Sequence, residues 1–339
     1  METRSRCSAP TTRGSSAVTT DRRRLDLALS SGREEKCAGS GDGANGYLGG
    51  AVVAALRSGG HEVVGLVRRE GADVPPGVAV RRADLRDTAA LGAAVRDIDV
   101  VCHLAGLTRV RESFADPLCY FEVNVGGTVA LLRAMDEGGV PKLVFASTAA
   151  VFGTPEVQPM SEDLPDHPPH PYAASKHAAE AVIAAQAATG AVDAIVLRLF
   201  NIAGGDDRDP TRIIPRILAT AAGESPVLTV NGDGSAVRDY VHIRDAAKAF
   251  VVAVERDAPV PCRTYNIGSE TGTSVNELIA AAHEVTGRPI PVEYRSAQPE
   301  PPRLISDCTR AHRELRWTPT HSAIRTILRH AWSSRPTPP

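Results

Sequence analysis

Short apolar runs alternate with amphipathic stretches from Gly43 to Phe200. The apolar runs are rich in β-branched residues and predict strands at His61–Arg68, Val78–Leu85, Asp99–Leu104, Lys142–Ser147 and Ala194–Phe200. The stretches between them have helical spacing and predict helices at Leu48–Ser58, Thr88–Arg96, Pro117–Asp136 and Tyr172–Thr189. Continuous apolar strands that alternate with helices form a parallel sheet covered on both faces. The pattern therefore predicts an α/β fold with a doubly wound parallel sheet.

The pattern changes after Phe200. Residues 204–210 are polar and rich in glycine and aspartate, and the chain beyond them mixes strand and helix patterns without regular alternation. We therefore predict one domain over residues 43–201 and a smaller α/β lobe over residues 202–333. Residues 1–42 are polar and are predicted to be an atypical, disordered segment.

Composition narrows the range of partners. The 38 lysines and arginines nearly balance the 40 acidic residues, and the net charge of −2 argues against nucleic acid as a partner. The six cysteines are scattered without a C-x-x-C pair, so we predict no metal site. The sequence has neither an apolar stretch of about 18 residues nor a signal-peptide pattern. We therefore expect a cytoplasmic protein that does not bind a membrane.

A glycine-rich turn, G-A-N-G-Y-L-G, opens the first domain at residues 43–49. Such glycines let a turn approach a pyrophosphate, which then lies against the N-terminus of the following helix. A flexible turn would carry the same glycines, but the helix and strand that follow favour a dinucleotide. The first domain is thus predicted to be a Rossmann-like NAD(P)-binding domain, and the smaller lobe to bind substrate. The turn residues predicted to contact the dinucleotide are Gly43, Gly46, Tyr47, Leu48 and Gly49.

The end of the strand after this turn bears on the choice of coenzyme. NAD-preferring members of the fold carry an acid there, which hydrogen-bonds the ribose hydroxyls. Here Val67 is followed by Arg68 and Arg69, and an arginine can pair with the 2′-phosphate of NADP. An ordinary surface pair is the alternative, so we predict NAD, with NADP left open by Arg68. Asp84 and Leu85, at the end of the next strand, are predicted to contact the adenine.

Tyr172 and Lys176 carry the predicted chemistry. They stand four residues apart in Y-A-A-S-K, so a helix presents both on one face. A tyrosine hydroxyl has a pKa near ~10, too high for a base at neutral pH. A lysine ammonium one turn away, together with a positively charged nicotinamide, lowers that pKa. Ordinary surface helices also show this spacing, so the neighbouring sequence must show whether the pair is catalytic.

That context is a buried strand that runs into Ser147 and Thr148. A hydroxyl at Thr148 can share a proton with the phenol of Tyr172 and with a substrate oxygen. Asn124, in F-E-V-N-V-G-G-T, lies on the long predicted helix and is expected to brace the active-site backbone. With Lys176, these residues form the predicted catalytic set.

Several motifs follow one another along the chain: H-L-A-G, E-S-F-A-D-P, N-V-G-G-T, F-A-S-T-A-A-V-F-G, P-Y-A-A-S-K, L-R-L-F-N and V-R-D-Y-V-H. In this order they resemble the NAD-dependent epimerase/dehydratase family of extended short-chain dehydrogenases/reductases, from Gly43 to Trp332. The UDP-glucose 4-epimerases are the subgroup that the chain resembles most. The resemblance assigns Leu104, Ala105 and Gly106 of H-L-A-G to the coenzyme, together with Lys176.

The resemblance implies a transient oxidation of a nucleotide sugar. Tyr172, as phenolate, would take the proton of the sugar 4-hydroxyl while hydride passes from C4 to the nicotinamide and later returns to the other face. Thr148 would relay the proton, with Ser147 as its helper. Asn201 and Arg238 would hold the substrate diphosphate.

Departures from the family pattern refine this expectation. Thr148 is followed by Ala149 and Ala150, where the 4,6-dehydratases of the family carry Asp-Glu and related decarboxylases a glutamate. Alanines cannot move protons, so dehydration and decarboxylation are disfavoured. Near the C-terminus the family often reads R-x-G-D, and this chain has A-Q-P-E. One phosphate-binding arginine is thus missing, and Arg303 is the predicted substitute.

The sequence therefore predicts an NAD(P)-dependent nucleotide-sugar epimerase, most specifically a UDP-hexose 4-epimerase. Two alternatives stay open: an NADPH-dependent ketone reductase of the same family, which Arg68 would favour, and a noncatalytic dinucleotide-binding protein. The resemblance also implies a homodimer built on the two long helices, Pro117–Asp136 and Tyr172–Thr189.

A strand is expected directly before the glycine turn, but residues 34–42 read E-E-K-C-A-G-S-G-D and have no strand pattern. Read from the second nucleotide of each codon, Ala38–Gly43 can encode Arg-Val-Leu-Val-Thr-Gly, the strand and turn opening that the family uses. We therefore hypothesise that the residues before Gly43 are translated out of frame. The nucleotide sequence of the gene tests this hypothesis.

Overall fold

A parallel sheet crosses the centre of the computed structural model, which describes residues 24–28, 44–69, 74–257, 259–298 and 300–335. The sheet has seven strands in the order β10-β6-β5-β4-β1-β2-β3, and every pairing in it is parallel. Its strands are β1 (Arg24–Ala28), β2 (Glu62–Val67), β3 (Ala79–Arg82), β4 (Val100–His103), β5 (Lys142–Thr148), β6 (Asp193–Leu199) and β10 (Cys262–Ile267). The predicted doubly wound, Rossmann-like α/β fold is confirmed.

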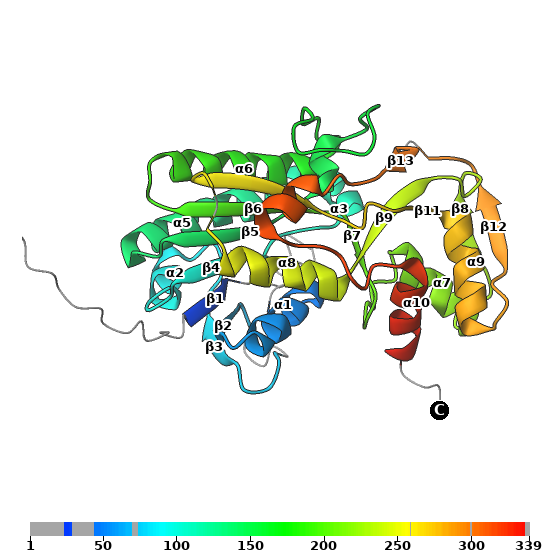
Figure 1. Ribbon diagram of the computed structural model, residues 1–339, viewed down its shortest axis with the longest axis horizontal. Helices are drawn as coiled ribbons and strands as arrows, with labels where there is room; N and C mark the ends of the chain where they lie inside the picture. The colour runs from blue at the N-terminus through cyan, green and yellow to red at the C-terminus, as the bar shows by residue number, and fades with distance from the viewer. Residues whose placement is uncertain (1–23, 29–43, 70–73, 258, 299, 336–339) are drawn as a thin grey trace, which may run out of the picture.

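Helices cover both faces of this sheet (Figure 1). One face carries α1 (Tyr47–Ser58) and α8 (Ile243–Glu255), and the other carries α2 (Thr88–Ala94), α5 (Gly127–Gly138) and α6 (Pro171–Ala188). Successive strand residues point to opposite faces, so Val100 and Cys102 of β4 join the first core and Val101 joins the second. This double burial explains why the strands are continuous apolar runs in the sequence.

The helix predicted over Pro117–Asp136 is present, but it is not regular. A short α3 (Val110–Ala115) precedes it, and it consists of α4 (Pro117–Phe121), a π-helical turn (Glu122–Gly126) and α5. Asn124 lies inside the π-helical turn and is buried. A π-helical turn inserts an extra residue into a helix and is found mostly at functional sites.

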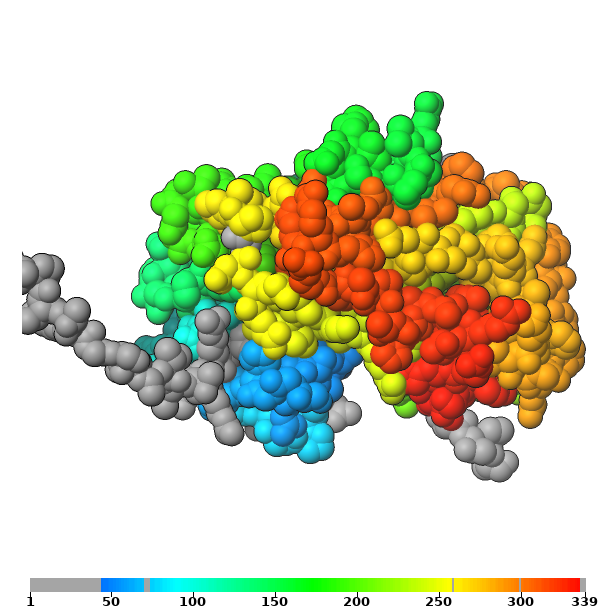
Figure 2. Space-filling view, viewed as in Figure 1, coloured from blue at the N-terminus to red at the C-terminus, as the bar shows by residue number. Residues whose placement is uncertain are grey.

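The smaller lobe contains two further sheets. β7 (Asn201–Ala203), β9 (Val237–His242), β11 (Gly272–Ser274) and β13 (Arg303–Leu304) form one, and β8 (Leu228–Asn231) and β12 (Val292–Arg295) form the other. Its helices are α7 (Ile213–Ala221), α9 (Val275–Thr286) and α10 (Ile324–Ser333). Figure 2 shows the orange-to-red C-terminal segment lying across the junction of the two lobes.

The predicted division at residue 201 needs one correction. α8 and β10 fall inside residues 202–333, yet α8 packs on α1 and β10 pairs with β6 in the large sheet. The chain therefore returns to the first domain before it completes the second lobe. In the described part of the chain, no helix has both the length and the apolar character needed to cross a membrane.

The central place in the sheet, between β2 and β4, belongs to β1. Leu27 pairs with Gly65 on one side and with Cys102 on the other. The prediction of disorder for residues 1–42 is therefore corrected for Arg24–Ala28. Residues 29–43, where the out-of-frame hypothesis applies and which include Gly43, lie outside the described residues.

The position of β1 predicts that Leu27→Pro is strongly destabilising. Proline in a central strand removes a ladder hydrogen bond, and the expected cost is about 3 kcal/mol or more in the free energy of unfolding by urea. Leu27→Val, which keeps the amide donor, is the control and should cost less than about 1.5 kcal/mol. An unchanged stability for Leu27→Pro would show that Arg24–Ala28 does not form the central strand.

Candidate active site

A cavity of about 470 Å³ lies between the two lobes, at the carboxyl ends of β5 and β6. Ligands of open parallel sheets bind at these strand ends. The wall from the large domain includes Tyr47, Leu48, Leu104, Ser147, Thr148, Tyr172 and Lys176. The wall from the smaller lobe includes Asn201, Asp207, Arg212, Arg216, Asn231, Arg238 and Glu300. Most residues singled out from the sequence thus meet in one cavity.

Tyr172 and Thr148 line the same wall of this cavity. Tyr172 stands in the first turn of α6, where the ring of His170 accepts a hydrogen bond from the Ala173 amide at 3.1 Å and lies stacked on the phenol ring. Burial raises the pKa of Tyr172, while the hydrogen bond from Thr148 and the positive charge of Arg212 act to lower it. The phenol therefore needs further positive charge before it can act as a base near neutral pH.

Lys176 lies one helical turn beyond Tyr172 and is 4% exposed. Its ammonium is 4.1 Å from the centroid of the Phe145 ring. Burial lowers the pKa of Lys176 to about 7, although the nearby carboxylate of Glu180 acts to raise it. The lysine can therefore exchange a proton close to physiological pH.

A buried ionic network below Lys176 was not anticipated from the sequence. Ser147 donates a hydrogen bond to Glu180, and Arg198 bridges Glu180 and Asp166 with N–O distances of 2.7 Å to each. Glu180 follows Lys176 by four residues, so this spacing was the only local signal for it. The network thus holds the Ser147 hydroxyl at the wall of the cavity, where it lies with Thr148 and Tyr172.

Asn124 fixes the chain that borders the coenzyme region. Its carboxamide accepts from the Leu107 amide at 2.8 Å and donates to the Leu107 carbonyl at 3.1 Å and to Ser175 at 2.9 Å. Gly106 has φ +154°, and a Cβ there would lie 2.7 Å from the Asn124 oxygen. Only glycine fits this position, so H-L-A-G and Asn124 form one unit.

The N-terminus of α1 is suited to an anion. Gly46 is its N-cap residue and offers no side-chain hydrogen bond, which leaves the first amides of the helix available. Tyr47 and Leu48 line the cavity, and Gly49 is buried in the helix. The Tyr47 hydroxyl donates to the Gly204 carbonyl, so the two lobes are joined beside this helix end.

Arg68 and Asp84 occupy the predicted adenine end of the coenzyme region. Their charged groups are 3.7 Å apart, and Asp84 also pairs with Arg86 at 2.9 Å. The hydrogen bond from Arg86 is the main reason why the pKa of Asp84 is lowered. Leu85 is buried against α5, below Gly127. Arg68 therefore already has an acidic neighbour in this structure.

The structure separates the predicted diphosphate residues. Asn201 and Arg238 line the cavity, where Arg238 pairs with Glu300 at 2.8 Å. Arg303, the predicted substitute for the missing family arginine, lines a different pocket with Ser235, Ser274 and Asn276. Arg216, which sequence reasoning did not single out, lines the main cavity instead.

Arg216 bonds to the backbone rather than to an acid of the described residues. Its guanidinium donates to the Thr229 carbonyl at 2.6 Å, and no carboxylate of the described residues forms an ion pair with it. Burial, then repulsion from Arg111 and Arg295, lower its pKa. Arginines that are held close together in this way favour binding of an anion.

A model of the NAD dependent epimerase/dehydratase family matches residues 43–268. The UDP-glucose 4-epimerase of Corynebacterium glutamicum is 37% identical over 309 residues, which span 86% of this chain and 93% of that protein. The UDP-glucose 4-epimerase of Streptomyces lividans is 36% identical over 308 residues, with coverage of 86% and 93%.

Solved structures show the same similarity. A UDP-glucose-4-epimerase from Stenotrophomonas maltophila, with bound NAD and formylated UDP-arabinopyranose, superimposes with a TM-score of 0.82 at 31% identity. The match covers 92% of this chain and 98% of that one. A UDP-glucose 4-epimerase from Brucella ovis in complex with NAD gives a TM-score of 0.82 at 29% identity, with coverage of 91% and 98%.

Proposed function

The chain belongs to the NAD dependent epimerase/dehydratase family, and we propose that it is an NAD-dependent epimerase that inverts C4 of a UDP-hexose. The observation that carries this proposal is that Thr148, Tyr172 and buried Lys176 line one cavity, which both lobes share. The curated relatives that are 33–37% identical to the chain are named UDP-glucose 4-epimerases.

The residues around the cavity fit NAD. The uncapped N-terminus of α1 suits its pyrophosphate, and the glycine at position 106 leaves room for close approach. Lys176, which lines the cavity one helical turn beyond Tyr172, would hold the nicotinamide ribose. When bound, the nicotinamide supplies the acceptor for the C4 hydride and its positive charge. That charge favours the phenolate of Tyr172, whose pKa is otherwise raised by burial.

The proton steps then follow from the hydroxyl pair. Tyr172 accepts the proton of the sugar 4-hydroxyl as C4 is oxidised to a ketone, and it returns that proton to the same oxygen when C4 is reduced from the other face. Between these two steps, Thr148 would donate a hydrogen bond to the tyrosine oxygen. Proton and hydride both return to the sugar, so the net reaction is an isomerisation without consumption of coenzyme.

The cavity gives no support to elimination chemistry. Ala149 and Ala150 form a 3₁₀ turn after Thr148 and carry no ionisable group. The acids that line the cavity, Asp207 and Glu300, both come from the smaller lobe and interact with Arg212 and Arg238. We therefore favour epimerisation over dehydration.

Arg238 and Arg216 are proposed to hold the diphosphate of the substrate. Both arginines line the cavity from the smaller lobe, and so does Asn201 of β7. Arg216 would supply the charge that the family obtains from the arginine of R-x-G-D. Arg303 has no place in this proposal, because it lines another pocket.

A homodimer is proposed on the surface formed by α3 and α4. Phe114 and Leu118 are 64% and 73% exposed there, and Val110 and Phe121 are also exposed. The neighbouring face of α6 is lined by exposed Ala181, Ala184, Ala185 and Ala188, which allow a second helix to approach closely. A second copy would bury this apolar area.

The proposed reaction predicts that Tyr172→Phe lowers kcat by at least about 10³-fold, because the base is lost. NAD binding, measured by fluorescence titration, should stay within about threefold of wild type. Tyr120→Phe is a matched control, since its ring lies 6.4 Å from the Tyr172 ring while its hydroxyl donates to the Arg109 carbonyl. A Tyr172→Phe enzyme with most of its activity would remove Tyr172 from the mechanism.

Substrate binding by Arg216 predicts a contrast between two arginine variants. Arg216→Ala should raise the KM for UDP-galactose by about 10–100-fold, the cost of one charge-assisted hydrogen bond or a bidentate pair. Arg303→Ala should leave that KM within about twofold. The reverse ranking in steady-state kinetics would restore Arg303 as the substitute for the family arginine.

The dimer proposal predicts that Leu118→Glu produces a monomer in sedimentation velocity runs. A carboxylate at this position would be buried without a partner in the interface. Val157→Glu is the control, since Val157 is 61% exposed in the connection between β5 and α6 and belongs to neither α3 nor α4. A wild-type monomer at tens of micromolar concentration would contradict the proposal.

A further inference from the structure

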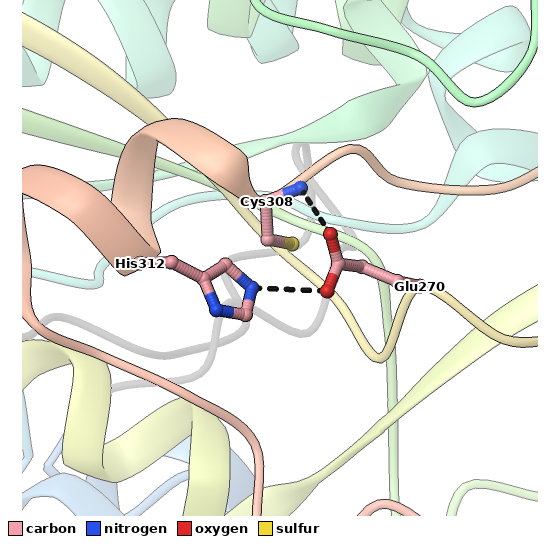
Figure 3. Close-up of side chains that lie close together, drawn as sticks. All are labelled: Glu270, Cys308 and His312. Atoms are coloured by element: carbon pink, nitrogen blue, oxygen red, sulfur yellow. Dashed lines mark hydrogen bonds and ion pairs between the residues drawn. The ribbon is translucent and has the colours of Figure 1, made fainter.

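Three side chains with metal-binding atoms converge outside the catalytic cavity (Figure 3). Glu270 lies in the connection between β10 and β11, and Cys308 and His312 belong to the helical turn that follows β13. The carboxylate, thiol and imidazole atoms all lie within 4.8 Å of one another. None of the three residues lines the cavity that contains Tyr172.

The helical turn presents two of these ligands together. His312 follows Cys308 by four residues, and its amide donates to the Cys308 carbonyl at 2.9 Å. Thus both side chains project from the same side of one turn, toward Glu270 (Figure 3). The Glu270 carboxylate is already positioned, because it accepts from the Cys308 amide at 3.0 Å.

The imidazole of His312 gives an independent indication of a ligand. Its Nε2 is shielded from solvent and has no hydrogen-bond partner. The atom lies 2.9 Å from a Glu270 oxygen, close enough for an ion pair, but the geometry does not make a hydrogen bond. A buried ring nitrogen of this kind is available to coordinate a metal ion.

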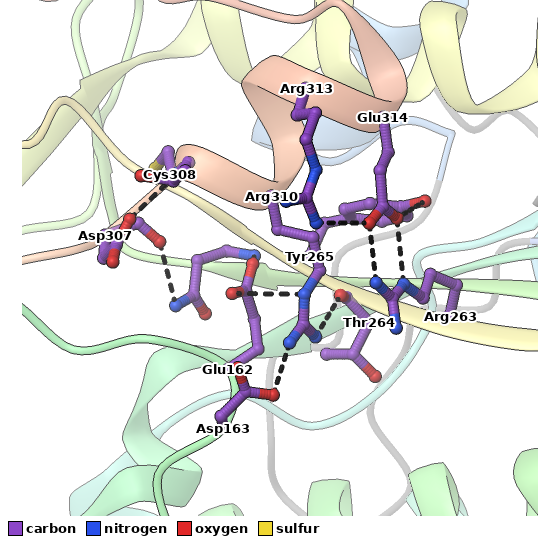
Figure 4. Close-up of polar contacts among 12 residues, drawn as sticks. Glu162, Asp163, Arg263, Thr264, Tyr265, Asp307, Cys308, Arg310, Arg313 and Glu314 are labelled. Atoms are coloured by element: carbon purple, nitrogen blue, oxygen red, sulfur yellow. Dashed lines mark hydrogen bonds and ion pairs between the residues drawn. The ribbon is translucent and has the colours of Figure 1, made fainter. Parts of the chain in front are cut away.

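The surroundings hold the ligand-bearing turn in place (Figure 4). Arg310 reaches Asp163 at 2.5 Å and Glu162 at 3.7 Å, and Glu314 pairs with Arg263 at 2.6 Å. These contacts join the turn to β10 and to the segment after β5. Metal sites need such outer contacts, because they fix the ligands before the ion binds.

The Glu270 segment is fixed from its own side. The Glu270 amide donates to Asp239 at 3.0 Å and to Ser306 at 3.2 Å. Asp239 is fully buried and also accepts from Ser269. The backbone on both sides of the cluster is therefore held by one buried carboxylate, which leaves the Glu270 side chain free to face Cys308 and His312.

We propose that Glu270, Cys308 and His312 form a binding site for Zn²⁺, with water as the fourth ligand. Thiolate, imidazole and carboxylate are the ligands that zinc takes in proteins, whereas Mg²⁺ and Ca²⁺ prefer oxygen alone. Zinc bonds of about 2.0–2.3 Å place neighbouring ligands roughly 3.5 Å apart, so small side-chain rotations complete the site. The Cys308 thiol, which now contacts Ser306 at 3.3 Å, releases its proton to solvent and becomes the thiolate ligand.

A second cluster of possible ligands is less suited to a metal ion. Asp166, His177 and Glu180 also bring ligand atoms within 4.8 Å of one another. There the guanidinium of Arg198 lies 2.7 Å from both carboxylates and already neutralises them. The Glu270 cluster contains no such cation among its ligands, and His312 and Glu270 are partly exposed, which gives an ion a route of entry.

The test measures zinc on the full chain, stripped with a chelator and then dialysed against ZnSO₄. We expect a single Zn²⁺ per chain by mass spectrometry and a rise in Tm of at least about 4 °C. His312→Ala, Glu270→Gln and Cys308→Ser should each weaken zinc binding more than about 100-fold in competition with a chromophoric chelator. Co²⁺ in place of zinc should give a thiolate charge-transfer band that is absent in Cys308→Ser.

His177→Ala and Cys262→Ala are the matched controls and should bind zinc as wild type does. His312 is partly exposed, so His312→Ala tests the site even if Cys308→Ser fails to fold. Failure of wild type to bind zinc at micromolar concentration, or full zinc binding by His312→Ala, would overturn the proposal. Epimerase activity is measured separately in the chelator-treated protein. That measurement tests the proposed function, whereas zinc binding alone tests the metal site.

Discussion

The burial of a lysine ammonium at the carboxyl edge of the sheet requires the surrounding residues to stabilise its charge. Lys176 is 4% exposed, and an isolated charge in that position would be costly. The ring of Phe145 and the carboxylate of Glu180 reduce this cost, and Arg198 then balances Glu180. Because Tyr172, Lys176 and Glu180 follow one another at intervals of four residues, α6 presents all three on the face that packs toward β5 and β6.

The same edge explains which parts of the site could be predicted from the sequence. The strand Lys142–Ser147 and the Tyr172-x-x-x-Lys176 spacing are local patterns. The continuous apolar run predicts the strand, and the effect of a nearby lysine on the pKa of a tyrosine points to the catalytic pair. The π-helical turn at Asn124 could not be predicted in this way. It depends on hydrogen bonds to Leu107 and Ser175, which come from other segments of the chain.

Long-range pairing accounts for the other differences. β10 looked like part of the smaller lobe because its partner, β6, precedes it by more than sixty residues, and only the sheet brings them together. Arg303 was predicted because it lies near A-Q-P-E in the sequence, but proximity along the chain does not show which pocket a side chain lines. Arg216, which lines the main cavity, is more than eighty residues before that motif. The place of Arg24–Ala28 in the sheet was equally invisible, since polar residues separate it from the glycine turn.

Thr148 shows how closely the fold and the chemistry are joined. Its oxygen accepts a hydrogen bond from the Ala150 amide at 3.2 Å and so caps the 3₁₀ turn that follows β5. With one lone pair occupied by the turn, the hydroxyl keeps its hydrogen and a second lone pair, so it can donate to a phenolate or accept from a phenol. The connection after β5 therefore holds in place a hydroxyl that can pass a proton in either direction, as a reversible reaction requires.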